Sequence, residues 1–314
     1  VRIIGDQTFY VVWNSGKLPA GEEALLTVED TNKELDFMAR YHKDTGRLHV
    51  GARRDAQQRF SPRPPPVLYM WPSGAIGDVH IVSSMEGYWH CDGHPTKCQA
   101  QSPDGFPHVQ LELQAVSLKP RAFVIDNFLS DYEVESIKSH ANRKLRPSSV
   151  GNAENTLTSN TRTSKNTWLN RDLSAVINSI FLRAADLLQV DEKLLSSFRR
   201  HAAEQLQVVH YEKFQHYDPH YDWAAEKHAD RFITLLLYLS NSSEAGGGGH
   251  TSFPKGEGID GNPFQIQPGK GSALLFYNLL PDGNSDINSL HEAVSLPSGE
   301  KWLANFWVWD PFIM

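Results

Sequence analysis

The sequence has few cysteines, no long hydrophobic run and no excess of positive charge. Only two of its 314 residues are cysteine, so it can form one intramolecular disulfide at most. No apolar run approaches the ~18–20 residues of a membrane-spanning helix, and no membrane contact is predicted. Thirty Lys and Arg against 37 Asp and Glu give a net charge of −7, which argues against nonspecific binding of nucleic acid or anionic lipid.

Other absences narrow the class of protein further. There is no internal repeat and no calcium-binding loop of alternating acidic residues. The glycine run 246–249 is not followed by Lys and Ser or Thr, which excludes a phosphate-binding loop and indicates a mobile connection. Hydrophobic residues make up 40%, aromatic residues 11% and charged residues 21%, which excludes collagen-like, coiled-coil and wholly disordered chains. The length suits one large domain or two of moderate size.

The two cysteines lie close together in a loop rich in Gly and Pro. Cys91 and Cys98 are seven residues apart, and a small disulfide ring is favoured over two free thiols. His90 and His94 beside them leave zinc as a third possibility, although the spacing matches no common zinc-finger pattern.

A glycosylation sequon, like a disulfide, is typical of proteins of the secretory pathway. It begins at Asn241 in a polar stretch. The chain starts at Val1 rather than Met, so a preceding signal or anchor segment is expected to lie outside it. Together these features predict the secretory pathway, in the lumen of the endoplasmic reticulum or Golgi.

Residues 1–112 are predicted to form a β-rich accessory domain. Short β segments alternate there with turn residues, as at Thr8 to Trp13, Leu48 to Gly51, Val67 to Trp71 and His80 to Ser83. Catalytic residue types do not cluster in this half, so its role and any ligand stay open.

Residues 113–314 show helices followed by strands. Ser130 and Glu133 form a capping box at the start of one helix, and a second helix follows Asn170 with a broad apolar stripe to Leu188. The strands predicted after them are Gln205 to Tyr211, Phe232 to Ser240, Ala273 to Tyr277, His291 to Leu296 and Lys301 to Asp310. This order predicts a mainly β domain with flanking helices on one side of a sheet or barrel.

Three residues have the types and spacing of a metal site. His220 and Asp222 are two apart, and alternation in an extended chain puts both side chains on one face. His291 opens a later predicted strand. Two histidines and one carboxylate form the facial triad of non-haem Fe(II) oxygenases, which leaves coordination positions open. The competing interpretation is three unrelated members of a set of 14 histidines and many carboxylates.

Lys301 strengthens the metal interpretation. It starts a strand ten residues after His291, and that strand is predicted to run back beside the one that carries the histidine. A buried ammonium group needs an anion. If iron binds a 2-oxo acid, Lys301 is placed to pair with the far carboxylate of that acid.

From about Pro120 to Asp310 the chain resembles the catalytic domain of the prolyl 4-hydroxylases, which are 2-oxoglutarate and Fe(II)-dependent dioxygenases. The matching blocks are Arg121 to Ser130, Thr161 to Ser164, Gln207 to Tyr211, Tyr217 to Asp222, Arg231 to Ser240, Gly248 to Pro254 and Ser289 to Trp302. The resemblance implies a double-stranded β-helix, or jelly roll, whose mouth holds the metal.

The resemblance implies a role for each matching position. His220, Asp222 and His291 match the iron ligands. The 2-oxoglutarate site is matched by Lys301, which pairs with the distal carboxylate, and by Thr251 and Tyr211.

On the substrate side, Arg162 matches an arginine of the substrate-covering loop, and an exposed loop arginine is the alternative. Trp307 is expected to line the pocket with Trp302 behind it, and Tyr217 adds an aromatic ring near the metal. Phe214 departs from the family's usual glycine, so the turn there is expected to have a different shape.

Three functions are compared. The first is a peptidyl prolyl 4-hydroxylase acting on proline-rich chains, with Fe(II), 2-oxoglutarate, O2 and ascorbate as its cofactors and cosubstrates. The second keeps this chemistry for another peptide residue or a small molecule, and the third is a non-catalytic peptide-binding module. The full set of ligands with Lys301 favours catalysis. The oligomeric state cannot be predicted from these patterns.

Overall fold

The computed structural model describes residues 9–10, 37–42, 47–52, 76–91, 98–101, 109–148, 161–188, 190, 192–195, 203–223, 231–241, 248–258, 262–280 and 285–309. Two compact units are found. The first comprises residues 1–74, 279–285 and 313, and the second comprises residues 75–278, 286–312 and 314. In the first unit, three antiparallel strands form a sheet in chain order: β1 (Phe9–Tyr10), β2 (Phe37–His42) and β3 (Arg47–Ala52).

The second unit is built on a large antiparallel sheet and a small one. The strands of the large sheet, in spatial order, are β4 (Val79–Ser84), β7 (Val109–Leu118), β8 (Arg121–Ile125), β16 (Ala273–Tyr277), β13 (Arg231–Tyr238), β18 (Lys301–Trp309), β11 (Leu206–Tyr211), β10 (Lys165–Leu169) and β9 (Arg146–Pro147). Those of the small sheet are β12 (Tyr217–His220), β17 (His291–Ala293), β14 (Thr251–Glu257) and β15 (Pro263–Ile266). A separate hairpin pairs β5 (Tyr88–Cys91) with β6 (Cys98–Gln101).

The eight strands from β11 to β18 form the predicted jelly roll. The chain passes repeatedly between the two sheets, so that four of these strands lie in the large sheet and four in the small one. Apolar side chains from both sheets meet between them, among them Leu236 and Leu303 from the large sheet and Phe253 and Phe264 from the small one. The mainly β fold with flanking helices is therefore confirmed.

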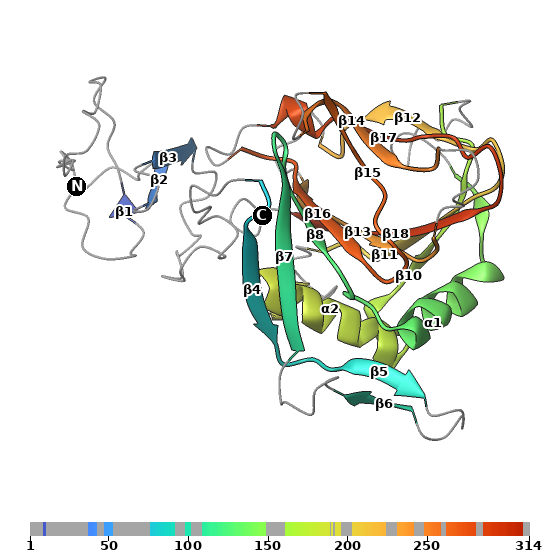
Figure 1. Cartoon of the computed structure of the whole chain (residues 1–314). Coiled ribbons are helices and arrows are strands. Elements are labelled where there is room, and N and C mark those ends of the chain that lie inside the picture. The colour runs from blue at the N-terminus through green and yellow to red at the C-terminus, as the bar shows by residue number, and fades with distance from the viewer. Residues whose placement is uncertain are drawn as a thin grey trace. The chain divides into compact units, whose positions relative to one another are not determined.

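Two helices cover the face of the large sheet that is turned away from the small sheet (Figure 1). Helix α1 (Asp131–Asn142) begins with the predicted capping box of Ser130 and Glu133. Helix α2 (Ala175–Leu188) follows a short 3-10 turn at Arg171–Leu173, and a second such turn spans Glu192–Leu195. The Phe181 ring of α2 packs edge-on against Phe306 of β18, with the ring centroids 4.7 Å apart.

The division of the chain differs from the predicted boundary at residue 112. Strands β4 and β7 lie before or across that residue, yet they pair with each other and extend the large sheet through β8. Alternate residues of β7, including Leu111, Leu113 and Ala115, are fully buried. An alternating pattern identifies a half-buried strand but not its partner, so these strands could not be assigned to a sheet from the sequence.

A buried ion pair joins the two helices to the start of β5. Arg183 of α2 donates to both carboxylate oxygens of Glu133 at 2.8 and 3.0 Å, and neither side chain is exposed. Arg183 also donates to the carbonyl of Gly87, and Glu133 accepts from the backbone N–H of Trp89. Residues of the predicted accessory half are thus held by the helices of the other half.

Phe214 corrects a prediction about the turn between β11 and β12. Its φ is 65°, so phenylalanine keeps the left-handed conformation that glycine would adopt. The turn is held by main-chain bonds from Phe214 to Leu296 and from Gln215 to Glu212. The Phe214 side chain is 65% exposed, which leaves it room in this conformation.

The remaining strand predictions are met to different degrees. Ala273–Tyr277 is found as predicted, whereas β17 ends at Ala293 rather than Leu296. The predicted strand at 67–71 and the first two glycines of the run 246–249 lie outside the described residues. Among the helices that are described, none has the length and apolar character needed to cross a membrane.

Candidate metal centre

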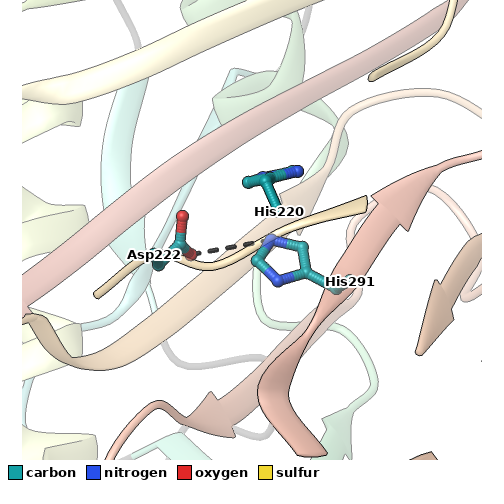
Figure 2. Close-up of side chains that lie close together, drawn as sticks. All are labelled: His220, Asp222 and His291. Carbon is teal, nitrogen blue, oxygen red and sulfur yellow. Dashed lines mark ion pairs between the residues drawn. The ribbon is translucent and has the colours of Figure 1, made fainter. Parts of the chain in front are cut away.

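The structure brings His220, Asp222 and His291 together. Strands β12 and β17 pair with His220 directly opposite His291, which sets the two rings side by side. Strand β12 ends at His220, so Asp222 lies in the bend beyond it and reaches the same site. One ligand atom from each residue lies within 4.8 Å of the others (Figure 2).

Both histidines are oriented by main-chain carbonyls. Nδ1 of His220 lies 2.8 Å from the carbonyl of Asp218, and Nδ1 of His291 lies 2.9 Å from that of Ser289. A carbonyl can only accept, so each Nδ1 carries the proton and each Nε2 is free to bind a metal. Burial, followed by the nearby His291, lowers the pKa of His220 to about 3, which keeps this ring neutral.

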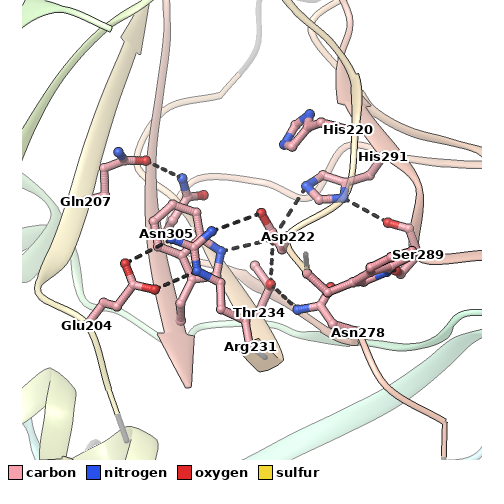
Figure 3. Close-up of polar contacts among 12 residues, drawn as sticks. Glu204, Gln207, His220, Asp222, Arg231, Thr234, Asn278, Ser289, His291 and Asn305 are labelled. Carbon is pink, nitrogen blue, oxygen red and sulfur yellow. Dashed lines mark hydrogen bonds and ion pairs between the residues drawn. The ribbon is translucent and has the colours of Figure 1, made fainter. Parts of the chain in front are cut away.

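Asp222 is 9% exposed and accepts hydrogen bonds from the large sheet (Figure 3). Its Oδ2 accepts from the Thr234 hydroxyl at 2.6 Å and from Trp307 Nε1 at 2.9 Å. Arg231 Nη1 lies 3.7 Å from Oδ1, and the same guanidinium is bound by Glu204. Burial raises the pKa of Asp222, but His291, Arg231, His220 and the Thr234 bond together outweigh it and lower the pKa to about 2.

Lys301 is a buried cation on β18, and the prediction that its strand runs beside that of His291 is wrong, because β18 pairs with β11 and β13 in the large sheet whereas β17 lies in the small one. It is 1% exposed, and its Nζ has no hydrogen-bond partner among the residues described. Burial lowers its pKa to about 7. Tyr211 lies directly opposite Lys301 in the pairing of β11 with β18, so the two side chains share the inner face of the sheet. An unpaired buried ammonium fits a carboxylate ligand.

Thr251 is connected to the surroundings of Lys301 through Tyr238. It is 2% exposed, and its hydroxyl is 2.9 Å from the hydroxyl of Tyr238. Lys301 Nζ lies 5.9 Å from the centre of the Tyr238 ring. Tyr238 therefore links two residues predicted for the cosubstrate, although the sequence did not single it out.

An aromatic and a cationic side chain are stacked in sequence on the His220 ring. The Tyr217 ring lies 3.6 Å from the His220 ring and nearly parallel to it, and Arg162 covers Tyr217 at 4.7 Å. Arg162 is 8% exposed and donates to Gln207, so the alternative of an exposed loop arginine is wrong. Trp307, which donates to Asp222, lies 5.8 Å from Trp168, and Trp168 is 40% exposed.

Trp302 occupies the other face of β18, as predicted. It stacks on His210 with the ring centroids 4.2 Å apart. Trp307 and Asn305 point to the opposite, inner face, where they donate to Asp222 and Gln207.

The sequence did not identify several polar residues around the centre: Glu204, Gln207, Arg231, Thr234, Tyr238 and Asn278. A usable signal was present on β13, because Thr234 interrupts an otherwise apolar run from Phe232 to Leu239. A buried polar side chain in such a strand needs a partner. The identity of that partner depends on which strands pair, and no local pattern gives it.

The donor set fits the metal implied by the triad. Two imidazoles and one carboxylate match the 2-His-1-carboxylate arrangement of Fe(II) oxygenases. Lys301 Nζ, without a hydrogen-bond partner in the described part of the chain, fits the distal carboxylate of a 2-oxo acid. His220, Asp222 and His291 would hold the ion, and Lys301, Thr251 and Tyr211 would bind the acid.

Comparisons with known proteins agree with this chemistry. A family model described as the 2OG-Fe(II) oxygenase superfamily matches residues 206–309. Probable prolyl 4-hydroxylase 6 of Arabidopsis thaliana is 33% identical over 216 residues, which cover 62% of this chain and 70% of that protein. Prolyl 4-hydroxylase 2 of the same plant is 32% identical over 236 residues, covering 67% of this chain and 74% of that protein.

A solved structure is also similar. It is the viral collagen prolyl hydroxylase of Paramecium bursaria Chlorella virus-1 in complex with 2-oxoglutarate. The identity is 28% and the TM-score 0.46, and the match covers 60% of this chain and 95% of the viral one.

Proposed function

The chain belongs to the prolyl 4-hydroxylase family of 2-oxoglutarate and Fe(II)-dependent oxygenases, and we propose that it hydroxylates proline residues in an extended, proline-rich peptide or protein. The observation that carries the proposal is the combination of His220, Asp222 and His291 with the buried Lys301, whose Nζ has no hydrogen-bond partner among the described residues. A site that only binds a structural metal ion does not need a buried lysine such as Lys301, whereas a site that also binds a 2-oxo acid does.

The residues of this chain have separable roles in that reaction. When bound, Fe(II) with 2-oxoglutarate and O2 supplies the oxidation of an unactivated C–H bond, and the 2-oxo acid is converted to succinate and CO2. The two imidazoles and one carboxylate would hold the ion and leave positions open. Lys301 orients the cosubstrate by its distal carboxylate, with Thr251 and Tyr211 beside it. The buried interior between the sheets excludes water.

The aromatic residues beside the metal centre favour a proline-rich substrate. Tyr217 stacks on the ligand His220, and the exposed Trp168 packs against Trp307, which contacts the ligand Asp222. A polyproline II chain is already extended and packs its rings on aromatic side chains. The net charge of −7 favours a neutral or basic peptide over an acidic one.

The test is succinate formation by purified, Fe(II)-loaded protein given 2-oxoglutarate, with and without a polyproline peptide. We expect peptide-dependent succinate and a mass increase of one oxygen on proline. His220→Ala and His291→Ala should abolish both products because the ion is lost. Turnover that no proline peptide stimulates but a small acceptor does would instead favour the second function, hydroxylation of another substrate.

Ascorbate is proposed as an accessory reductant, by analogy with the chemistry that the resemblance implies. It is expected to extend the number of turnovers without changing the initial rate. Repeating the succinate assay with and without ascorbate over a long time course tests this expectation. A time course that ascorbate does not alter would contradict it.

We also propose that the chain works in the secretory pathway. The register of β5 and β6 supports this, because it places Cys91 directly opposite Cys98 and a cross-strand pair of cysteines is close enough for a disulfide. Asn241 is exposed, and its bond to the Lys270 N–H uses Oδ1, which leaves the amide nitrogen that carries a glycan. Alkylation with and without prior reduction, read by mass spectrometry, tests the disulfide; two alkylated thiols in the unreduced protein would contradict it.

A further inference from the structure

The carboxylate of Asp222 is supported by a different part of the fold from the two histidines. Each histidine is held by a carbonyl two residues earlier in its own segment. Asp222 is held by side chains of the large sheet, from Thr234 on β13 and Trp307 on β18. Asp222 is therefore the ligand whose position depends on how the two sheets are packed.

A second residue stands behind Thr234. Asn278 follows β16 directly, and its Nδ2 lies 2.8 Å from the Thr234 hydroxyl. Both Asn278 and Thr234 are fully buried. The three residues form a chain of hydrogen bonds that runs from β16 through β13 to the metal centre (Figure 3).

Chemistry fixes the direction of these bonds. An ionised carboxylate can only accept, so the single hydroxyl proton of Thr234 is donated to Asp222. The Thr234 oxygen must then accept, and the Asn278 amide must present its NH2 group. Asn278 Oδ1 has no hydrogen-bond partner in the described part of the chain, so it offers no competing orientation for the amide.

We propose that Thr234 and Asn278 are positioning residues for the metal, and this rests on the function proposed above. The donors from Thr234 and Trp307 hold Oδ2 of Asp222, the carboxylate oxygen that lies 3.7 Å from Nε2 of His291, and so fix the carboxylate beside the other ligands. Arg231 faces Oδ1 at 3.7 Å but is bound more closely by Glu204, at 2.5 Å. Without the Thr234 donor the carboxylate can rotate, and the three ligands no longer match one ion.

Cobalt(II) binding to the purified chain tests the proposal without turnover. Thr234→Val keeps the side-chain shape but removes the donor, and we expect about 10- to 100-fold weaker cobalt binding and a changed visible spectrum of the bound ion. Thr234→Ser keeps the hydroxyl and should restore both. Asn278→Leu should weaken binding less, because Thr234 still donates to Asp222.

A matched control separates positioning from stability. The Ser84 hydroxyl is also buried and also donates to a carboxylate, that of Asp186 at 2.9 Å, but it lies outside the metal centre. Ser84→Ala should lower the melting temperature and leave cobalt affinity and spectrum unchanged. Cobalt affinity and spectrum of Thr234→Val equal to those of the unaltered chain would overturn the proposal. If that variant does not fold, the same result for Asn278→Leu would overturn it.

His220→Ala distinguishes failure of this proposal from failure of the proposed function. If His220→Ala binds cobalt as the unaltered chain does, the metal centre itself is wrong and both proposals fall. If His220→Ala loses the ion while Thr234→Val retains it with an unchanged spectrum, the positioning role alone is overturned.

Discussion

Lys301 is a lysine buried in the protein interior, where burial disfavours its charged form. It is buried, it lacks a hydrogen-bond partner in the described structure, and burial lowers its pKa to about 7. A dianionic 2-oxo acid beside it would reverse this shift, because an opposite charge favours the ammonium form. Cosubstrate binding and protonation of Lys301 should therefore be linked.

The affinity for 2-oxoglutarate should fall as pH rises above about 7. Above that pH the ligand-free Lys301 is mostly neutral, so binding must take up a proton and the dissociation constant should rise by up to about tenfold per pH unit. Calorimetric titration of the cobalt-loaded chain in buffers of different ionisation enthalpy measures both the affinity and the proton uptake.

Lys301→Met serves as the control for this titration. It removes the titrating group, so weak binding that no longer depends on pH in this range is expected. The charge of Lys301 also acts on His250; burial followed by this charge lowers the pKa of His250, so that His250 is neutral over the same range. A pH-independent affinity in the unaltered chain would contradict the linkage.

At the scale of single residues, the sequence predicted the metal ligands and the lysine of the cosubstrate site. Two histidines, a carboxylate and a lysine stand out by type and spacing. Thr234 and Asn278 do not, because their role arises only when β13, β16 and β18 lie side by side. Phe214 shows the opposite error, since a general preference of glycine for positive φ was taken as a requirement.

At the scale of elements, the buried pair of Arg183 and Glu133 binds α1 and α2 to the start of β5. The pair is fully buried and makes further bonds to the carbonyl groups of Phe128 and Gly87. Taking two charges out of water costs free energy, which only the complete set of partners offsets. Loss of one partner leaves the other charge buried alone.

Arg183→Met should lower the free energy of unfolding by about 3–5 kcal/mol. Urea denaturation followed by circular dichroism measures this change. The double variant Arg183→Met with Glu133→Gln should be more stable than Arg183→Met alone, because the uncompensated carboxylate is then gone.

The exposed pair of Lys119 and Glu257 provides the comparison. Its side chains are 60% and 62% exposed, so Lys119→Gln should cost less than about 1 kcal/mol. Equal losses for Lys119→Gln and Arg183→Met would show that burial does not govern these pairs.

The long elements could be predicted, but strands β12, β14 and β15 of the small sheet could not. Helices α1 and α2 and strands β11, β13, β16 and β18 have clear capping or apolar patterns. Strand β12 is four residues long and contains Pro219, and β14 contains Pro254 and Gly256. Proline and glycine both argue against a strand when only the local sequence is considered. These strands nevertheless belong to the sheet that carries both histidines.

At the scale of the whole molecule, the boundary between the two units determines which part of the chain can fold alone. Strands β4 and β7 complete the large sheet, and β7 pairs along β8. A chain that begins at Ala75 keeps these strands, whereas one that begins at Leu113 loses β4, β5 and β6 and cuts into β7.

The version that begins at Ala75 should fold and bind cobalt as the whole chain does. The version that begins at Leu113 should aggregate, because the rest of β7 becomes an edge strand without β4 and the bonds of Arg183 and Glu133 to residues 87 and 89 are lost. Size-exclusion chromatography and cobalt titration of both versions measure these outcomes. A soluble, metal-binding version from Leu113 would support the boundary predicted from the sequence.

The pairing of His220 with His291 across β12 and β17 makes the site sensitive to strand slippage. In a two-residue repeat, sliding one strand by a single residue turns its side chains to the opposite face. The two imidazoles would then point away from each other instead of drifting slightly apart. A slip between β12 and β17 should therefore destroy the metal centre in one step, because a histidine ligand is lost completely and the distance between the ligands does not increase gradually.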